Sequence, residues 1–287
     1  MWCWKKKSPL ISEKSLPSVA EYILSEQCTK IVTMAGAGIS TAAGIPDFRS
    51  PSSGLYAQLA ALRLPYPEAV FDFDYFTQNP VPFFRICKEM YPKLKVKPTL
   101  THYFIKLLDD KGLLLRHYTQ NIDGLERKAG LCEDKLIQAH GTYETGHCLK
   151  CNKGYSLKWM ETYVMSDTIP MCIACGALVK PDIILFGEGI PQRVVSKCRS
   201  DFRSCDLLLI LGSSLTVEPI ASFAGLVKKK CPRVLINRTP VQKRGFRFQN
   251  SDSRDIAWYG NSDEGCSTLA LYLGWEKDLV KLMGNKK

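Results

Sequence analysis

Four cysteines in the middle of the chain have the spacing of a metal site. Cys148 and Cys151 form one Cys-x2-Cys pair, and Cys172 and Cys175 form a second pair after twenty intervening residues. Two such pairs supply the tetrahedral thiolate set of a zinc ribbon. Because all four ligands are sulfur, no coordination position is left for water. The spacing therefore predicts one structural Zn²⁺ and not a catalytic one.

Two polar clusters directly follow apolar, strand-like segments and are candidates for chemistry. Gln120, Asn121 and Asp123 follow residues 113–118, and His140 follows residues 135–138. A buried strand end seldom carries amide and carboxylate side chains together unless a ligand binds there. An imidazole can exchange a proton near neutral pH, so we predict that His140 is a general base. The other three histidines, His102, His117 and His147, have no such polar neighbours in the sequence.

A glycine turn after residues 30–35 is a second candidate for ligand binding. Gly36 and Gly38 let the backbone approach a pyrophosphate, which we expect at the N-terminus of a following helix. The segment departs from the dinucleotide fingerprint, since Thr41 replaces the third glycine and no acid lies near position 56, which disfavours a hydride-transfer dehydrogenase. Small and polar residues that could surround an adenosine ribose follow two later apolar segments: Gly212, Ser213, Ser214, Asn237 and Arg238.

These residues need a scaffold that places the ends of several strands together. Apolar segments of strand length alternate with helix-length segments, which predicts an α/β fold with a parallel, Rossmann-like sheet covered on both faces. The expected strands are residues 30–35, 113–118, 183–186, 206–211 and 233–236, and the expected helices include 19–24, 101–110 and 219–229. Ligands of such sheets bind at the carboxyl ends of the strands, where the polar clusters lie.

Two segments interrupt this alternation and predict a smaller inserted domain. One is rich in proline and aromatic residues, and the other contains the four cysteines. We expect a Rossmann-like domain from residues 19–52, 96–143 and 178–287, and an N-terminal extension over residues 1–18. The small domain would combine a helical module, residues 53–95, with a zinc-ribbon module, residues 144–177.

The charge and the hydropathy exclude several classes of protein. The formal net charge is +11, but the Lys and Arg residues lie in short separated clusters, so a nucleic-acid partner is disfavoured. No apolar segment approaches the length of a membrane span, so no membrane partner is expected. The N-terminus lacks the apolar core of a secretory signal. We predict a cytoplasmic location, with the nucleus as the alternative.

In this order, the clusters resemble the sirtuin family. The segments that carry the resemblance span much of the chain: residues 36–40, 44–50, 119–123, 139–142, the four cysteines, 180–188, 212–215 and 236–238. Further segments resemble those of one eukaryotic subclass, which holds the cytosolic, tubulin-deacetylating members and the mitochondrial members. These segments are residues 64–69, 110–115 and 266–275.

The resemblance implies an NAD-dependent protein lysine deacetylase or deacylase. Its products would be nicotinamide, 2'-O-acyl-ADP-ribose and the free lysine, with His140 as base and Asn121 orienting the ribose. The implied NAD contacts are Gly36, Ala37, Gly38, Ile39, Ser40, Thr41, Asp47, Phe48, Arg49, Gln120, Asn121, Ile122, Asp123, Gly212, Ser213, Ser214, Asn237, Arg238, Thr239 and Ser262.

The partners implied by the resemblance are acyl-lysine proteins or peptides, with tubulin and histones as candidates. A substrate strand would pair between two segments of the chain. The implied peptide contacts are Ile184, Leu185, Phe186, Gly187, Glu188 and Glu218.

The chain departs from the family pattern at two positions, and two other functions are alternatives to the deacylase. Thr239 replaces the usual acid and Ser213 the usual Thr, and both concern the adenosine side of the site. A protein ADP-ribosyltransferase would need the same NAD site, so only its products distinguish it. A non-catalytic zinc-ribbon binding protein is disfavoured because it has no use for His140 beside Gln120 and Asp123.

Overall fold

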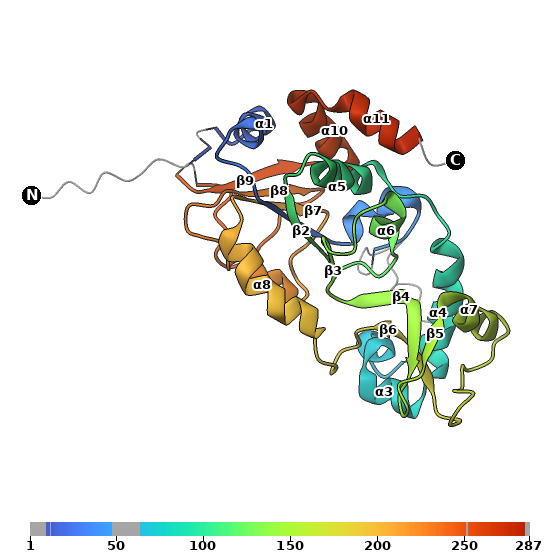
Figure 1. The fold of residues 1–287 in the computed structure, drawn as a ribbon. Helices are drawn as coiled ribbons and strands as arrows, with labels where there is room; N and C mark the ends of the chain where they lie inside the picture. Colours follow the sequence, from blue (N-terminus) through green and yellow to red (C-terminus); the bar gives the residue numbers. More distant parts are fainter. Residues whose placement is uncertain (1–9, 12, 48–63, 251, 285–287) are drawn as a thin grey trace, which may run out of the picture.

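A six-stranded parallel sheet forms the centre of the larger part of the molecule (Figure 1). The structure is a computed structural model that describes residues 10–11, 13–47, 64–250 and 252–284. The strand order is β3-β2-β1-β7-β8-β9. The strands are β1 (Ile31–Ala35), β2 (Leu114–Thr119), β3 (Leu136–Gln138), β7 (Leu207–Leu211), β8 (Arg233–Asn237) and β9 (Asp255–Tyr259). Every neighbouring pair is parallel, so their carboxyl ends meet at one edge.

Helices cover both faces of this sheet. Ile31 and Ala35 of β1 pack into one core and Val32 and Met34 into another, as the alternation of side chains along a strand requires. The first core is covered by α1 (Leu16–Leu24), α5 (Leu100–Asp110), α10 (Ser262–Leu273) and α11 (Glu276–Gly284), with the short α6 (Leu125–Ala129) beside α5. The second core is covered by α8 (Gln192–Ser204) and α9 (Ile220–Phe223). Burial on both faces explains the continuous apolar sequence of β7.

A second, smaller unit lies beside the carboxyl edge of the large sheet (Figure 1). Its antiparallel sheet has the order β5-β4-β6, from β4 (Gly141–Cys148), β5 (Gly154–Ser156) and β6 (Val179–Ile183). Helices η4 (Pro67–Phe71), α3 (Phe73–Gln78), α4 (Val81–Lys93) and α7 (Leu157–Met165) pack with it around one further core. Edge-to-face contacts between Phe76, Phe83 and Phe84 occupy the centre of the helical part.

Most expected elements are confirmed, but two were assigned wrongly and one strand was missed. Residues 183–186 do not form a strand of the parallel sheet: the strand ends at Ile183 and belongs to the small antiparallel sheet. The helix expected over residues 219–229 is limited to Ile220–Phe223. The sequence also gave no indication of β9, which extends the parallel sheet at its edge. No helix in the described part of the chain has the length and apolarity needed to cross a membrane.

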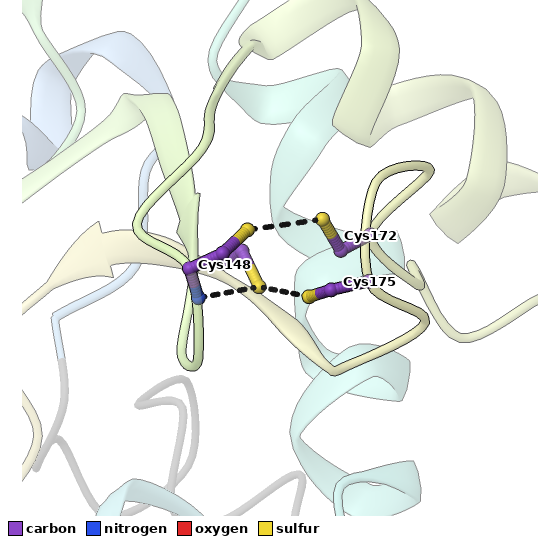
Figure 2. Close-up of side chains that lie close together, drawn as sticks. Cys148, Cys172 and Cys175 are labelled. Atoms are coloured by element: carbon purple, nitrogen blue, oxygen red, sulfur yellow. Dashed lines mark hydrogen bonds between the residues drawn. The ribbon is translucent and has the colours of Figure 1, made fainter.

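The four cysteines predicted to bind zinc are brought together next to the small sheet. Figure 2 shows Cys148, at the end of β4, facing Cys172 and Cys175 from the loop that precedes β6. The Sγ atoms of Cys148 and Cys175 are 3.4 Å apart, and those of Cys151 and Cys172 are 3.5 Å apart. Four ligands about 2.3 Å from one ion stand about 3.8 Å from each other in a tetrahedron, so the cluster needs little adjustment to hold Zn²⁺.

Hydrogen bonds favour the thiolate form, which zinc requires, at two of the four cysteines, Cys148 and Cys172. The backbone N–H groups of Lys150 and Cys151 donate to the sulfur of Cys148, each at 3.4 Å. The hydroxyl of Tyr155 donates to the sulfur of Cys172 at 3.1 Å, and this bond, together with backbone N–H groups such as that of Ala174, lowers the pKa of the Cys172 thiol to about 6. The donor set therefore fits a closed, structural Zn²⁺ site.

Replacing Cys172 by Ser should release the zinc and disorder the small unit. Structural zinc contributes an apparent ~10–16 kcal/mol to folding, which is comparable with the whole stability of a domain. Metal content and thermal unfolding, measured together, test this expectation. Cys132→Ser is the matched control, since Cys132 is exposed and outside the cluster.

Substitution of cobalt for zinc tests whether the metal takes part in the reaction. The closed sulfur set predicts an unchanged pH–rate profile, because no metal-bound water is available to titrate. A shift of the profile by about one pH unit or more in a folded cobalt form would contradict a purely structural metal.

Candidate functional site

A cavity of about 470 Å³ lies at the carboxyl edge of the parallel sheet, where β1, β2, β7 and β8 end. The loops after β1 and β7 touch: the N–H of Gly38 donates to the carbonyl of Gly212 at 2.9 Å. Gly212 has φ +56°, and a Cβ on it would lie 2.6 Å from the carbonyl carbon of Gly38. Only glycine fits there, so the backbone itself forms this wall of the cavity.

The helix expected directly after the glycine turn is not formed. Two 3₁₀ turns, Ala37–Ile39 and Thr41–Ala43, take its place. Gly44 ends the second turn with φ +85°, and Pro46 follows it closely, so the chain cannot continue as an α-helix. The backbone still approaches the cavity, but an anion there would not lie at the N-terminus of an α-helix.

Most of the expected NAD contacts line this cavity. The expected residues that do so are Gly36, Ala37, Gly38, Thr41, Asp47, Gln120, Asn121, Gly212, Ser213, Ser214, Asn237, Arg238, Thr239 and Ser262, together with His140. Ile39, Ser40 and Asp123 are buried behind the wall, and Ile122 lines a different cavity. Phe48 and Arg49 lie outside the described residues. Thr216, Val217 and Asn261 also line the cavity and were missed, because they lie in loops without a recognisable motif.

His140 is held in one orientation by the end of the neighbouring strand. Its Nδ1 lies 2.9 Å from the backbone carbonyl oxygen of Gln120. A carbonyl can only accept, so Nδ1 carries the proton and Nε2 keeps its lone pair. Burial lowers the pKa of His140, and the bond to Gln120 offsets this only in part. His140 is thus a neutral base at neutral pH, with its basic nitrogen fixed.

The amide side chains after β2 connect the strand ends. Gln120 accepts a hydrogen bond from Ser213, at 2.8 Å, while its own Nε2 is buried without a partner among the described residues. Asn121 donates to the carbonyl of Gly36 at 3.1 Å and to Ser40 at 3.2 Å. Ser40 in turn donates to Asp123 at 2.7 Å. An unused buried donor on the wall of a cavity is what a polar ligand such as NAD would satisfy.

A second cavity, of about 240 Å³, opens between the two units. All six residues expected to contact the peptide line it: Ile184, Leu185, Phe186, Gly187, Glu188 and Glu218. Its other lining residues, including Phe71 and Ile122, are mostly apolar. Gln120, His140 and Val217 line both cavities, so the two spaces meet at the proposed base.

The rim of the second cavity is fixed by ion pairs and backbone pairing. Glu188 contacts the buried Lys180 at 3.0 Å and accepts from the N–H of Leu185 at 2.8 Å. Glu218, which also lines this cavity, forms an ion pair with Lys243. The N–H and C=O of Phe186 already bond to residues 71 and 73, at 2.7 and 2.9 Å. On the other edge of the 184–188 segment, Leu185 is bonded to Glu188 through its N–H, at 2.8 Å, and its C=O, at 3.0 Å, so a peptide strand would have to displace these bonds to pair there.

Comparison with known proteins agrees with this arrangement. The model of the Sir2 family matches residues 36–219. Sirtuin-2 of Danio rerio, an NAD-dependent protein deacetylase, is 50% identical over 288 residues, covering 96% of this chain and 76% of that protein. The NAD-dependent protein deacetylase sirtuin-3 of Mus musculus is 47% identical over 96% of this chain and 82% of its own length.

A fungal protein shows the same extent of likeness. The NAD-dependent protein deacetylase hst2 of Schizosaccharomyces pombe is 45% identical over 95% of this chain and 80% of its own length. These alignments span both units and both cavities. The chain belongs to the Sir2 family, and it is an enzyme of the NAD-dependent protein deacetylase type.

Proposed function

We propose that His140 is the base of an NAD-dependent removal of acyl groups from protein lysine, acting where the two cavities meet. The observation that supports this most is the shared wall: His140 lines both cavities, its Nδ1 is bonded to Gln120, and its Nε2 has no hydrogen-bond partner among the described residues. NAD, when bound in the larger cavity, supplies the ADP-ribosyl group that accepts the acyl oxygen and releases nicotinamide. His140 then removes a proton from a ribose hydroxyl.

Asn121 and Asp123 are proposed to serve the nicotinamide end of NAD. Asn121 lines the larger cavity, and its amide is held by Gly36 and Ser40, so it can orient a ribose without moving. Asp123 lies directly behind it, 6% exposed, with Ser40 and the N–H of Leu125 donating to its two oxygens. Binding of the carboxamide to Asp123 would require a small opening of this wall.

The apolar second cavity is proposed as the tunnel for the acyl-lysine side chain. Its walls include Phe71, Ile122 and Ile183, which suit the aliphatic stem of lysine and an uncharged acyl group. The peptide backbone would lie outside it, between residues 184–188 and Glu218. Release of 2'-O-acyl-ADP-ribose and acceptance of acyl groups longer than acetyl belong to the same proposal.

The remaining assignments are also proposals. We propose the domain boundaries given above with one change: residues 179–183 are counted in the small unit, because they form strand β6 of the antiparallel sheet. Tubulin and histones remain candidate substrates, and a cytoplasmic or nuclear location remains a prediction. The adenosine end of the site would use Asn237 and Arg238, with Arg238 3.9 Å from Asp47.

Replacing His140 by Ala should lower kcat by about 10²–10⁴-fold, because the reaction loses its general base. NAD binding, measured by calorimetry, and the unfolding temperature should change little, since His140 makes one side-chain hydrogen bond to the backbone. His147→Ala is a matched control because His147 lines neither cavity. Full activity of the His140 variant would disprove the assignment.

The pH dependence of kcat should reflect the burial of His140. The neutral form is the active base, and burial lowers the pKa of His140 below its ordinary value of 6.5. Activity at saturating NAD should therefore persist as the pH falls to 6.5 and decline only below it. A decline centred above that value would show that His140 is protonated more easily than the structure indicates.

Replacing Asp123 by Ala should weaken inhibition by nicotinamide about 10- to 100-fold, the effect of losing one hydrogen bond to a charged group. Inhibition constants measured at a fixed NAD concentration test this. Asp134→Ala, which removes an exposed carboxylate, should leave the inhibition constant unchanged. Unchanged nicotinamide sensitivity in the Asp123 variant would contradict its proposed role.

A further inference from the structure

A buried polar cluster lies behind Asp123, inside an otherwise apolar core. Glu126, from α6, is 1% exposed, His102, from α5, is 1% exposed, and His117, from β2, is fully buried. One side-chain atom each of His102, Asp123 and Glu126 lies within 4.8 Å of the other two. Neither histidine was singled out by the sequence. Packing of two helices against β2 creates the cluster.

Hydrogen bonds define the role of each member of the cluster. His117 contacts Thr33 at 2.6 Å through Nδ1 and Glu126 at 3.4 Å through Nε2. The N–H of Thr99 donates to Nδ1 of His102, so neutral His102 carries its proton on Nε2. That Nε2 and Oε2 of Glu126 are both buried without a partner among the described residues. The cluster therefore holds one buried donor and one buried acceptor whose hydrogen bonds are not made.

Two buried carboxylates this close cannot both ionise easily. Asp123 has two good donors, Ser40 and the N–H of Leu125, yet burial, and then the charge of Glu126, raises its pKa to about 7. Burial is the largest single influence and would raise the pKa of Glu126, but the hydrogen bond from His117, the charge interactions with His102 and His117, and a bond to Thr119 together outweigh it, so the pKa of Glu126 is lowered. Below about pH 7 the negative charge of the pair is thus on Glu126 and the proton is on Asp123, and above it Asp123 ionises as well.

Among the described residues, few other charged groups act on Asp123 and Glu126. On α6, Lys128 lowers the pKa of Asp123, but its ammonium group is held by the carbonyl oxygens of Leu94 and Val96. From α10, Asp263 acts on His102, and its carboxylate is taken up by Thr101. Burial lowers the pKa of His102 to about 4, so His102 is neutral when Asp123 titrates.

We propose that Glu126, held by His117, is a positioning residue that sets the charge of Asp123 and thereby the pH at which the enzyme holds nicotinamide. The inference rests on the proposed contact of Asp123 with the carboxamide. Ionised Asp123 accepts a strong, charge-assisted hydrogen bond from the carboxamide NH₂ group, whereas protonated Asp123 is a weaker acceptor because one of its oxygens carries the proton. Nicotinamide inhibition, and the capture of NAD, therefore strengthen as the pH rises through about 7.

The test is the nicotinamide inhibition constant of the full chain, measured against pH for the wild type and for Glu126→Gln. Glutamine has the shape of glutamate without its charge. Removing that charge lets Asp123 ionise more easily, so the midpoint of the pH dependence should fall by about one unit or more. Glu133→Gln is the matched control, since Glu133 is an exposed carboxylate of a neighbouring loop. It should leave the midpoint in place.

His117→Leu provides a second test if Glu126→Gln does not retain its fold and zinc. Without His117, Glu126 loses its main donor, whereas Asp123 keeps Ser40 and Leu125. The proton should then move to Glu126, and the midpoint should again fall. A midpoint within about 0.3 units of wild type in a folded variant of either kind would overturn the proposal.

Asp123→Asn separates this inference from the proposed function. The pH step in nicotinamide inhibition should disappear in this variant, because asparagine does not titrate. If the step persists, or if nicotinamide does not inhibit the wild type at any pH, the role of Asp123 itself is wrong. If the step disappears but the Glu126 and His117 variants keep the wild-type midpoint, only the role of the cluster is wrong.

Discussion

The hydrogen bond between Nδ1 of His140 and the carbonyl oxygen of Gln120 is the contact on which the site depends. It forms because β2 and β3 are parallel neighbours in register, with Thr119 beside Gln138 and the N–H of Ala139 bonded to Thr119 at 2.9 Å. The two strands therefore end side by side, and the imidazole reaches the neighbouring backbone. This fixes the tautomer, so the basic nitrogen is defined by the sheet and not by a mobile side chain.

The same position joins the two units. Directly after His140 the chain enters β4 through Gly141, which has φ +78° and passes so close to β6 that a Cβ would lie 1.9 Å from the carbonyl oxygen of Asp182. The carbonyl of His140 also accepts from the N–H of Ile184 at 2.9 Å. The small unit, organised by its cysteine cluster, thus brings the 184–188 segment against the base. We therefore expect zinc to affect catalysis through this packing and not through chemistry at the metal itself.

Residues at strand ends could be predicted from the sequence, because motifs and apolar segments are local. The cysteine motif and the polar residues Gln120 and His140, which follow two apolar segments, could be found in this way. The wrong strand over residues 183–186 shows the limit: a short apolar segment does not reveal which sheet it joins. Thr216, Val217 and Asn261 line the cavity only because of how their loops pack. The pairing of His117 with Glu126 depends on contacts between β2 and α6, although the two residues are only nine positions apart.

His140 is proposed to act as the single base on two substrates, NAD and an acyl-lysine peptide, that meet from separate cavities. Mass spectrometry of an acetyl-lysine peptide, incubated with the protein in the presence and absence of NAD, tests it most directly. The structure predicts that nicotinamide, acetyl-ADP-ribose and the deacetylated peptide form in equal amounts, and only when NAD is present. Release of acetate without NAD, or transfer of ADP-ribose onto the peptide with the acetyl group retained, would contradict the account.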